Sequence, residues 1–523
     1  MNRKTTTALL LCLSVNMISV MADVILAPIF SDNMVLQEST LAPIWGTAEP
    51  NENIIVSATW GLQDCRAQTG KDGKWMVKVK TPHSGGPYEI TIKAANTIVL
   101  KDVLIGQVWL CSGQSNMFMP VGGIEWAPDG VENADQVLSK PKQPMLRLFC
   151  DDGHQLWKGA KWQVAAPDTI KPFSATAYFF GVKLLEELNV PIGLINISRG
   201  GSPIQQWTPK EYNDKVPVTK KYSDLFTQHR EQIDAYNKAF NAYYEAAKSK
   251  SQTLPKPQLP QPLPDDINAA RGFYGCVLYD NLIAPIVPFA IRGVIWYQGE
   301  ANAAHPEIAM HYDDMLNALI SAWRDKWQQS DMPFYFVQLP GWDNKQYAQN
   351  WVWVRQSMLN VCQTTTNTGM AVTIDAGDPK DIHPMRKKPV GERLALLALA
   401  KTYGKLCVYS GPLPIAVSND GKDLRIRFDT FGSSLKLLND KFNDLEVAGN
   451  DGVFYPATGE ITQTDAIVSC PQVIAPAALR YGWQCYFQPT LLNTEDIPAS
   501  PFYFIRQTDE KWYLATAANV NVK

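Results

Sequence analysis

Residues 103–117 read VLIGQVWLCSGQSNM, and this stretch decides how the rest of the chain is interpreted. Residues 103–110 form a short apolar run, which is typical of a strand that is buried on both faces. The polar and glycine-containing residues that follow end the strand in a loop, and this loop carries Ser115. The sequence therefore predicts a buried strand with a hydroxyl side chain just beyond its carboxyl end.

Similar apolar runs recur along the middle of the chain, at residues 192–197, 291–297, 334–339 and 370–374. Helical patterns alternate with them, at residues 175–189, 308–327 and 390–403. Strands and helices in alternation predict an α/β fold, an open parallel sheet with helices on both faces. Ligands of such sheets bind outside the carboxyl ends of the strands. We therefore expect any active site in the loops that follow these runs.

The two ends of the chain have a different sequence pattern, in which apolar and polar residues alternate. Residues 75–80 and 424–428 show this pattern, and turn signals such as Ser84-Gly85-Gly86-Pro87 separate the runs. Short alternating runs between turns are typical of antiparallel β-structure. The sequence thus predicts all-β domains at both ends of the chain. The expected boundaries are an N-terminal β-sandwich at 23–103, an α/β domain at 104–404 and a C-terminal β-rich domain at 405–523.

Two segments lie outside this three-domain pattern. We expect an insertion around residues 210–270, because a tyrosine-rich helical stretch at 222–248 precedes a proline run at 254–264. Such a proline run fits neither a helix nor a central strand. Residues 1–22 combine a basic start with an apolar run and a small residue at the end. They predict a signal peptide, and hence a secreted protein, either periplasmic or extracellular.

The composition excludes several classes of protein. Apolar residues make up 46% of the 523 residues and charged residues 19%, which is typical of a folded chain and not of a disordered one. Lysine and arginine number 48 against 51 aspartate and glutamate, a net charge of −3. Such a balance gives no attraction to nucleic acid or to an anionic membrane. We expect neither as a partner after removal of the signal peptide, and the composition leaves the oligomeric state open.

A serine hydroxyl needs a base to remove its proton before it becomes a good nucleophile. Of the six histidines, His383 follows the last apolar run of the predicted sheet, within the sequence DPKDIHP at 378–384. Ser115 is not in the G-x-S-x-G motif of α/β-hydrolases, because the second residue after it is Met117. The sequence contains no H-E-x-x-H or Walker motif, so nothing in it requires a metal or another cofactor.

Several longer stretches resemble one known family. They are GQSNM at 113–117, VIWYQGEAN at 294–302, DIHP at 381–384, PIGLIN at 191–196, GGS at 200–202, LYDNLIAP at 278–285 and DNMVLQ at 32–37. In their order along the chain, the stretches between residues 113 and 384 closely resemble the sialate O-acetylesterase family of the SGNH hydrolase group, over about residues 104–400 without the insertion. The stretch at 32–37, in the predicted N-terminal β domain, also resembles this family. The resemblance implies an SGNH-type parallel sheet. It also implies a serine esterase that removes O-acetyl groups from carbohydrate, with sialic acid as the favoured sugar, through an acetyl-enzyme intermediate.

The resemblance further implies a role for each candidate catalytic residue. Ser115 is expected to attack the acetyl carbonyl, while His383 removes the serine proton and later gives it to the sugar hydroxyl. Asp381, two residues before the histidine, is expected to orient the imidazole. Asp378 and Glu300 are alternative acids, and a serine–histidine dyad is a further alternative. Glu300 has a structural alternative as well, in which it binds loop N–H groups beneath the serine.

The oxyanion that forms during ester hydrolysis needs prepositioned hydrogen-bond donors. The backbone of Ser115 and the turn formed by Gly200 and Gly201 are candidates, and a side-chain amide from Gln298 or Asn302 could complete the set. Each of these residues has a simpler explanation, since two glycines can make a tight turn and a glutamine can cap a strand. Their shared position after predicted strands favours the oxyanion hole.

Four residues near these loops are candidates for sugar binding. Trp207, Trp296 and Trp342 could each stack on a sugar ring, although a given tryptophan is more often part of the core. Arg199 precedes the glycine pair, where related sequences usually carry an aromatic residue. Its guanidinium could bind a sialate carboxylate or pair with a local acid.

Two other functions stay open on the sequence. Similar cores remove acetyl groups from xylan and other plant polysaccharides, so an acetylxylan or other polysaccharide acetylesterase is the first alternative. The second is a secreted carbohydrate-binding protein without catalysis, and the joint presence of Ser115, His383 and Asp381 argues against it. The expected partner of the enzyme is an acetylated carbohydrate.

Overall fold

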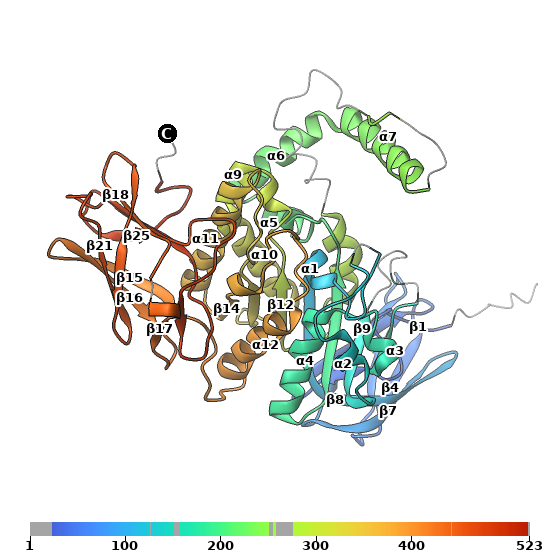
Figure 1. Ribbon diagram of the computed structural model, residues 1–523. Helices are drawn as coiled ribbons and strands as arrows, with labels where there is room; N and C mark the ends of the chain where they lie inside the picture. Colours follow the sequence, from blue (N-terminus) through green and yellow to red (C-terminus); the bar gives the residue numbers. More distant parts are fainter. Residues whose placement is uncertain are drawn as a thin grey trace, which may run out of the picture.

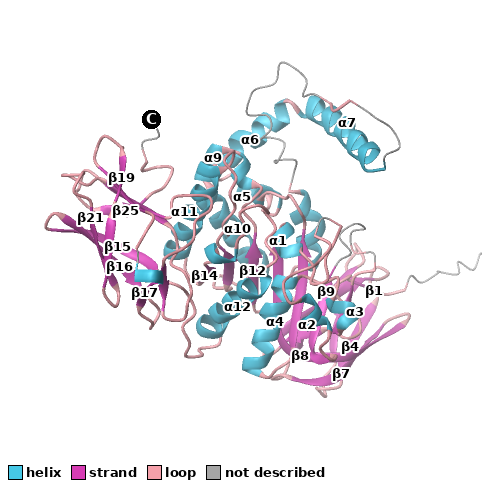
Figure 2. Cartoon of the chain, viewed as in Figure 1, coloured by secondary structure: helices cyan, strands magenta, loops and turns pink. Residues whose placement is uncertain are grey.

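The computed structural model shows a central α/β region between two β regions, one toward each end of the chain (Figures 1 and 2). The structure describes residues 23–125, 127–150, 157, 159–249, 255–257, 276–440 and 442–520. The predicted signal peptide at 1–22 and most of the predicted proline run at 254–264 lie outside the described residues. The predicted α/β class with all-β regions on both sides is confirmed.

The central sheet contains β8 (Thr97–Gly113), β9 (Gln143–Cys150), β10 (Lys161–Ala165), β11 (Ile192–Ser198), β12 (Gly293–Tyr297), β13 (Phe334–Val337) and β14 (Thr368–Ala371). Their order across the sheet is β10-β9-β11-β8-β12-β13-β14. β10 is an antiparallel edge strand, and all the other neighbours run parallel. The apolar runs that predicted a parallel sheet all contribute strands to it.

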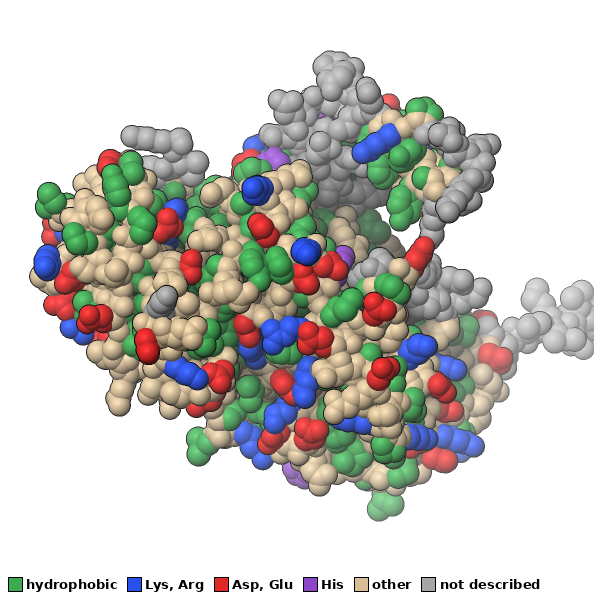
Figure 3. Space-filling view, in the orientation of Figure 1, with side chains coloured by type: hydrophobic (Ala, Val, Ile, Leu, Met, Phe, Trp, Pro, Cys, Tyr) green, Lys and Arg blue, Asp and Glu red, His purple; other side chains and the backbone are tan. Residues whose placement is uncertain are grey.

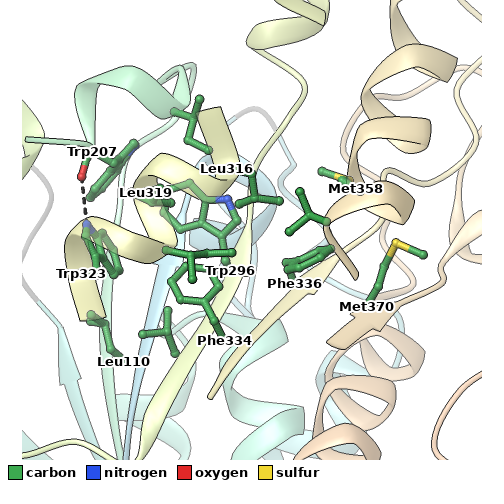
Figure 4. Packing of buried hydrophobic residues seen from close by; sticks show 14 of the residues in the cluster. Leu110, Trp207, Trp296, Leu316, Leu319, Trp323, Phe334, Phe336, Met358 and Met370 are labelled. Atoms are coloured by element: carbon green, nitrogen blue, oxygen red, sulfur yellow. Dashed lines mark hydrogen bonds between the residues drawn. The ribbon is translucent and has the colours of Figure 1, made fainter. Parts of the chain in front are cut away.

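Helices cover both faces of this sheet, with α4 (Ala175–Leu188) and α12 (Lys387–Leu397) on one face and α10 (Tyr312–Trp327) and α11 (Ala348–Thr364) on the other. Successive residues of a strand point to opposite faces. Trp109 of β8 accordingly packs with the α4 and α12 side, whereas Leu110 packs with the α10 and α11 side. Figure 4 shows the second side, where Leu110 lies near Trp296 and Phe334.

The N-terminal β region contains β1 (Ile25–Leu26), β2 (Val35–Gln37), β3 (Leu41–Thr47), β4 (Asn53–Ala58), β5 (Cys65–Gln68), β6 (Lys74–Lys80) and β7 (Gly85–Lys93). β1, β3 and β6 form one sheet. β5, β4 and β7 pair in turn and continue into β8, which also pairs with β2. Residue 103, the predicted end of the first domain, lies inside β8. One long strand thus belongs to both the N-terminal region and the central sheet.

The C-terminal β region contains β15 (Leu413–Asp420), β16 (Asp423–Asp429), β17 (Leu435–Leu437), β18 (Leu445–Ala448), β19 (Phe454–Pro456), β20 (Thr458–Ile461), β21 (Asp465–Ser469), β22 (Ala478–Tyr481), β23 (Leu491–Asn493), β24 (Phe502–Arg506) and β25 (Trp512–Leu514). They form three sheets, β15-β16-β21-β20, β17-β23 and β19-β18-β22-β24-β25. Every pairing in these sheets is antiparallel. None of these strands pairs with a strand of the central sheet among the described residues.

Shorter helices occupy the loops, namely α1 (Ser115–Phe118), α2 (Ala134–Leu138), α3 (Pro167–Ile170) and α9 (Pro306–Met310). The described part of the predicted insertion contains α5 (Lys210–Asn213), α6 (Pro217–Gln228) and α7 (Arg230–Ser249). α6 and α7 project from the body of the molecule (Figure 1). Basic and acidic side chains are intermixed on the face shown in Figure 3. Within the described ranges, every helix is too short or too polar to cross a membrane.

Candidate active site

Five loops meet at the edge of the central sheet where its parallel strands end. β8 leads to Ser115, β11 to Gly200, β12 to Glu300, β13 to Trp342 and β14 to His383. These residues are far apart in the sequence, yet all of them line one cavity of about 900 Å³. The cavity therefore lies at the carboxyl ends of the strands, where a doubly covered α/β sheet binds its ligands.

A sharp turn at the end of β8 presents the Ser115 hydroxyl to this cavity. Gly113 has a φ of +142°, and a Cβ there would lie 2.1 Å from the carbonyl oxygen of Tyr297, so only glycine fits. Ser115 then begins the short helix α1. Its Oγ lies 2.9 Å from Nε2 of His383, which is a hydrogen-bond distance. The structure thus brings together the serine and the histidine that the sequence suggested as a pair.

The half-buried imidazole of His383 has surroundings that favour its neutral form. Burial lowers the pKa of His383, the cation of Lys387 lowers it further, and Asp381 acts in the opposite direction. A neutral imidazole can accept a proton from a serine hydroxyl, whereas an imidazolium cannot. The contact and the direction of the pKa shift therefore both suit proton transfer from Ser115.

The three candidate acids have different surroundings. Oδ1 of Asp381 lies 3.7 Å from Nδ1 of His383 and accepts a hydrogen bond of 2.8 Å from the backbone N–H of the same histidine. Asp378 accepts hydrogen bonds from two backbone N–H groups of its own loop. Glu300 accepts a hydrogen bond from Asn116. Of the three, Asp381 is the acid that the structure places beside the imidazole ring.

Glu300, Asn116 and Lys387 form a buried polar chain beside the serine loop. Nδ2 of Asn116 donates to Oε1 of Glu300 over 2.6 Å, and Nζ of Lys387 donates to Oδ1 of Asn116 over 2.6 Å. Burial raises the pKa of Glu300 and lowers the pKa of Lys387 to about 7, and in each case the opposite charge acts against burial. Glu300 therefore supports the serine loop through the side-chain amide of Asn116.

Asn116 and Lys387 are not among the site residues predicted from the sequence. Asn116 belongs to the GQSNM stretch, so its place directly after Ser115 was a usable signal. Lys387 and Lys388 are adjacent lysines at the start of α12, and the first is buried while the second is exposed. Nothing in the sequence separates them, because the difference depends on which way the helix faces the rest of the protein.

The glycine turn after β11 lies next to the serine. A Cβ at Gly200 would lie 3.6 Å from the Cβ of Ser115, and Gly201 has a φ of +66° that suits a tight turn. The N–H of Ser115 belongs to the first turn of α1, where N–H groups have no acceptor within the helix. Ser115, Gly200 and Gly201 all line the cavity, so the glycine turn and the start of α1 lie side by side at its wall.

The side-chain amides of Gln298 and Asn302 do not line the cavity, which corrects the expectation for both. Nε2 of Gln298 donates to Oδ1 of Asn302 over 2.7 Å, and Nδ2 of Asn302 donates to Oε1 of Gln205 over 3.0 Å. Oε1 of Gln298 accepts a hydrogen bond from the hydroxyl of Tyr312. Both amides are buried and need such partners, because an unsatisfied buried polar group is costly. They hold the loop after β12 together.

Of the three tryptophans considered for sugar stacking, only Trp342 lines the cavity. Its ring stacks on that of Tyr347, with the ring centroids 5.9 Å apart. Trp207 and Trp296 are fully buried and pack edge to face in the core beside α10 (Figure 4). A sugar cannot reach either of them, so Trp342 is the one of the three candidates whose ring faces the cavity.

Two further side chains on the cavity wall come from different parts of the chain. Arg199 precedes the glycine turn, and its Nη1 donates to the carbonyl oxygen of Ser198 over 2.9 Å. Tyr244 comes from α7 of the insertion and is 57% exposed. The insertion thus contributes an aromatic ring to the cavity. In the part of the chain that the structure describes, no group of three or more His, Cys, Asp or Glu side chains could hold a metal ion.

Comparisons with known proteins agree with this architecture. The profile of a family described as "Carbohydrate esterase, sialic acid-specific acetylesterase" matches residues 105–244 and 271–399, just over half of the chain. A solved carbohydrate acetylesterase from Xanthomonas citri is similar with a TM-score of 0.74 and 30% identity, covering 92% of this chain and 99% of that one. The sialate O-acetylesterases of Rattus norvegicus and Homo sapiens are 28% and 26% identical, over 90% and 91% of this chain and 93% and 91% of theirs. The chain therefore belongs to the sialic acid-specific acetylesterase family and is a carbohydrate esterase, a carboxylic ester hydrolase.

Proposed function

We propose that this carbohydrate acetylesterase is a secreted serine esterase whose substrate is O-acetylated sialic acid. The observation that carries the proposal is the 2.9 Å contact between Oγ of Ser115 and Nε2 of His383 at the cavity. A hydroxyl in contact with a neutral imidazole is the arrangement that nucleophilic ester hydrolysis needs. The remaining residues of the site then have roles that follow from where they lie.

In the first half of the reaction, the oxygen of Ser115 attacks the acetyl carbonyl carbon while Nε2 of His383 takes the serine proton. The tetrahedral intermediate collapses when the bond between the acyl carbon and the sugar oxygen breaks. The imidazolium gives its proton to that oxygen, so the sugar leaves with a free hydroxyl. Asp381 stabilises the imidazolium that exists between these two transfers, since its carboxylate lies 3.7 Å from Nδ1.

The negative oxygen of the intermediate is bound by backbone N–H groups of Ser115 and of the Gly200–Gly201 turn. The short distance between Gly200 and Ser115 supports this assignment, because both ends of the donor set then lie within reach of one acyl group. Loss of one such donor typically costs ~10²- to 10³-fold in rate. In the second half of the reaction, His383 takes a proton from water while the water oxygen attacks the acetyl-enzyme. The bond between the acyl carbon and the Ser115 oxygen then breaks, the imidazolium returns its proton to that oxygen, and acetate leaves.

The choice of sialic acid is supported by the charge and the aromatic surface of the cavity. Sialic acid carries a carboxylate, and Arg199 brings a guanidinium to the cavity wall. Trp342 offers an aromatic ring on the same cavity, against which the apolar face of a sugar can pack. The xylose backbone of xylan is uncharged and would gain nothing from the cation. Secretion is supported by the basic and apolar pattern of residues 1–22.

The test measures acetate release by the purified protein from O-acetylated sialic acid and, in parallel, from acetylated xylan. The Ser115→Ala variant is compared with Ser112→Ala, which removes a buried hydroxyl that has no hydrogen-bond partner among the described residues. We expect faster release from the sialic acid, a loss of activity in Ser115→Ala, and wild-type activity in Ser112→Ala. Arg199→Gln is expected to raise KM for the sialic acid more than for xylan.

The outcomes of this test separate the substrate from the mechanism. Faster release from xylan, still lost in Ser115→Ala, would keep the serine mechanism and overturn the substrate. Full activity in Ser115→Ala would overturn the mechanism. If neither substrate releases acetate and a fluorophosphonate leaves no adduct on Ser115, the proposal of a serine esterase fails as a whole.

A further inference from the structure

We propose that Lys387 and Glu300 are positioning residues, which orient the side chain of Asn116 so that it holds the His383 loop against the Ser115 loop. The inference rests on the proposed function, in which Ser115 and His383 carry out the chemistry. Neither charged residue needs to touch the acetyl group for this role. Both act through the amide that lies between them.

Asn116 connects the two loops that carry the reacting side chains. It follows Ser115 directly in α1, and it is 0% exposed. Its Nδ2 donates a hydrogen bond of 2.9 Å to the carbonyl oxygen of Ile382, the residue before His383. The amide is thus one residue away from each reacting side chain. A change in its position would shift the serine loop relative to the histidine loop.

The surroundings of Asn116 select one of the two orientations of its amide. Rotation of such an amide by half a turn exchanges its oxygen and nitrogen with little change in shape. Here Nδ2 faces Oε1 of Glu300 and Oδ1 faces Nζ of Lys387, each over 2.6 Å. The rotated amide would place its oxygen against a carboxylate and its NH₂ group against an ammonium group. It would also lose the bond to Ile382, so the two charges together favour the orientation that joins the loops.

Stability alone does not explain why two charged side chains are buried here. Burial of oppositely charged side chains adds little to stability compared with apolar residues of similar size. Lys387 is 0% exposed and Glu300 is 6% exposed. Nζ of Lys387 also lies 5.5 Å from the ring centroid of Tyr297, a position that suits a cation. Neutral residues of similar size would not select one orientation of the Asn116 amide. The two charges do select one, and this explains why charged side chains are buried here.

Lys388 is the natural control for Lys387. Its side chain is 50% exposed, and its Nζ lies 3.9 Å from a carboxylate oxygen of Glu392 one helical turn later. Such exposed pairs contribute little to stability. The two lysines are adjacent in the sequence and begin the same helix, so Lys388→Met changes the charge of α12 as Lys387→Met does, without reaching the active site.

The experiment measures kcat and KM for Lys387→Met, Glu300→Gln, the double variant and Lys388→Met with 4-nitrophenyl acetate. This ester reports on the acyl chemistry whichever sugar is the natural one. We expect Lys387→Met to lower kcat about 10²-fold, because displacement of reacting groups by about 1 Å has effects of that size. KM is expected to stay within about threefold, since substrate binding is not changed. Lys388→Met is expected to match the wild type.

The double variant tests whether the two charges act through the same amide. We expect it to lose no more activity than Lys387→Met alone, because residues that work as one unit have non-additive effects. Losses that multiply in the double variant would overturn the proposal. So would a wild-type kcat in Lys387→Met at an unchanged melting temperature. If Lys387→Met does not fold, Glu300→Gln decides, since it keeps the shape of the glutamate: a lower kcat at unchanged KM and melting temperature supports the proposal, and a wild-type kcat overturns it.

Ser115→Ala, measured in the same series, separates the two proposals. If the Ser115→Ala variant is still active, the proposed function itself is overturned. An inactive Ser115→Ala together with a fully active Lys387→Met overturns the positioning role and leaves the proposed function intact.

Discussion

The two β regions are attached to the central sheet in different ways. The N-terminal region shares a strand with it, because β8 runs from Thr97 to Gly113 through both sheets. The C-terminal region shares no strand with it among the described residues, and hydrogen bonds from the Arg355 side chain and from the backbone of Trp342 join the two instead. Figure 1 shows the two regions on opposite sides of the α/β region. The same type of secondary structure therefore supports different parts of the active site by different means.

The N-terminal attachment acts on the strand that carries the nucleophile candidate. β2 pairs in parallel with β8, with Leu36 opposite Ile105. The side chain of Gln37 continues this ladder, since its Oε1 accepts a hydrogen bond of 3.0 Å from the backbone N–H of Val108. Ser115 thus follows a strand whose backbone is hydrogen-bonded from one region into the next.

The C-terminal attachment acts on the aromatic wall of the cavity. Arg355 of α11 is fully buried, and its guanidinium donates to carbonyl oxygens on both sides of the junction, those of Leu339, Pro340, Gln484 and Cys485. Burial lowers the pKa of Arg355 to about 9, so the group is still a cation near neutral pH. The backbone N–H of Trp342 donates to the same carbonyl of Cys485. Side-chain contacts to backbone carbonyls thus hold the loop that carries Trp342.

The largest effect is expected where β8 passes from one sheet to the other. A Cβ at Gly106 would lie 2.0 Å from the carbonyl oxygen of Pro191, which is backbone and cannot move aside easily. We expect Gly106→Ala to lower the free energy of unfolding by about 4 kcal/mol. Gly61→Ala in the N-terminal region is the control, because nothing lies within 4 Å of its added Cβ. Urea unfolding curves that coincide for both variants would contradict the tight junction.

A smaller loss of stability, with an added effect on binding, is expected for Arg355→Met. The substitution leaves buried carbonyl oxygens without their charged donor, which should cost about 3 kcal/mol. Because the Trp342 loop loses its support, KM for the acetylated sugar should rise about tenfold while kcat changes little. Arg425→Met, which removes two surface ion pairs, with Asp420 and Asp465, in the C-terminal region, serves as the control. If KM stays at the wild-type value, the C-terminal region supports the fold but not the cavity wall.

A still smaller loss of stability is expected when one serine at each junction is replaced by alanine. Oγ of Ser500 accepts a hydrogen bond of 2.8 Å from Nε2 of Gln338, and Oγ of Ser31 accepts one of 2.9 Å from the backbone N–H of Trp162. Ser500 is fully buried, whereas Ser31 is half-buried. We expect Ser500→Ala to cost about 1 kcal/mol and Ser31→Ala to cost less, because water can replace its hydroxyl. Equal losses in urea unfolding would show that the two junctions do not differ in this respect.

Much of the fold was predictable from the sequence, because buried parallel strands are written as continuous runs of apolar residues. The resemblance to the family is confirmed, and the proximity of Ser115 and His383 followed from their shared position after strands. The predicted domain boundary at residue 103 lies inside the continuous strand β8. The apolar run alone does not indicate that the first part of this strand pairs with the N-terminal β region. The sequence could indicate which residues follow a strand, but not where one sheet passes into the next.

The candidate residues for substrate contact were harder to predict. Trp207 and Trp296 lie near the right loops in the sequence, but their rings turn into the core, which only the packing against α10 decides. Gln298 and Asn302 follow the right strand, yet their amides satisfy each other and not an oxyanion. Lys387 was missed because the sequence does not show which of the adjacent residues Lys387 and Lys388 lies on the buried face of α12. These failures share a cause, since side-chain direction depends on contacts between distant segments.

The smallest effect expected is on the pH dependence, and it tests whether the C-terminal junction also acts on the histidine loop. Only neutral His383 can accept the serine proton, and burial together with Lys387 lowers the pKa of that histidine below its usual value of about 6.5. The acidic limb of kcat/KM should therefore lie below pH of about 6.5 in the wild type. Removing the Lys387 cation removes a cause of the lowering, so the limb of Lys387→Met should move to higher pH. Arg355→Met acts on the aromatic wall and should leave the limb in place. A shift of the limb in Arg355→Met would mean that the C-terminal junction also governs the histidine loop, and the division of labour between the two junctions would be wrong.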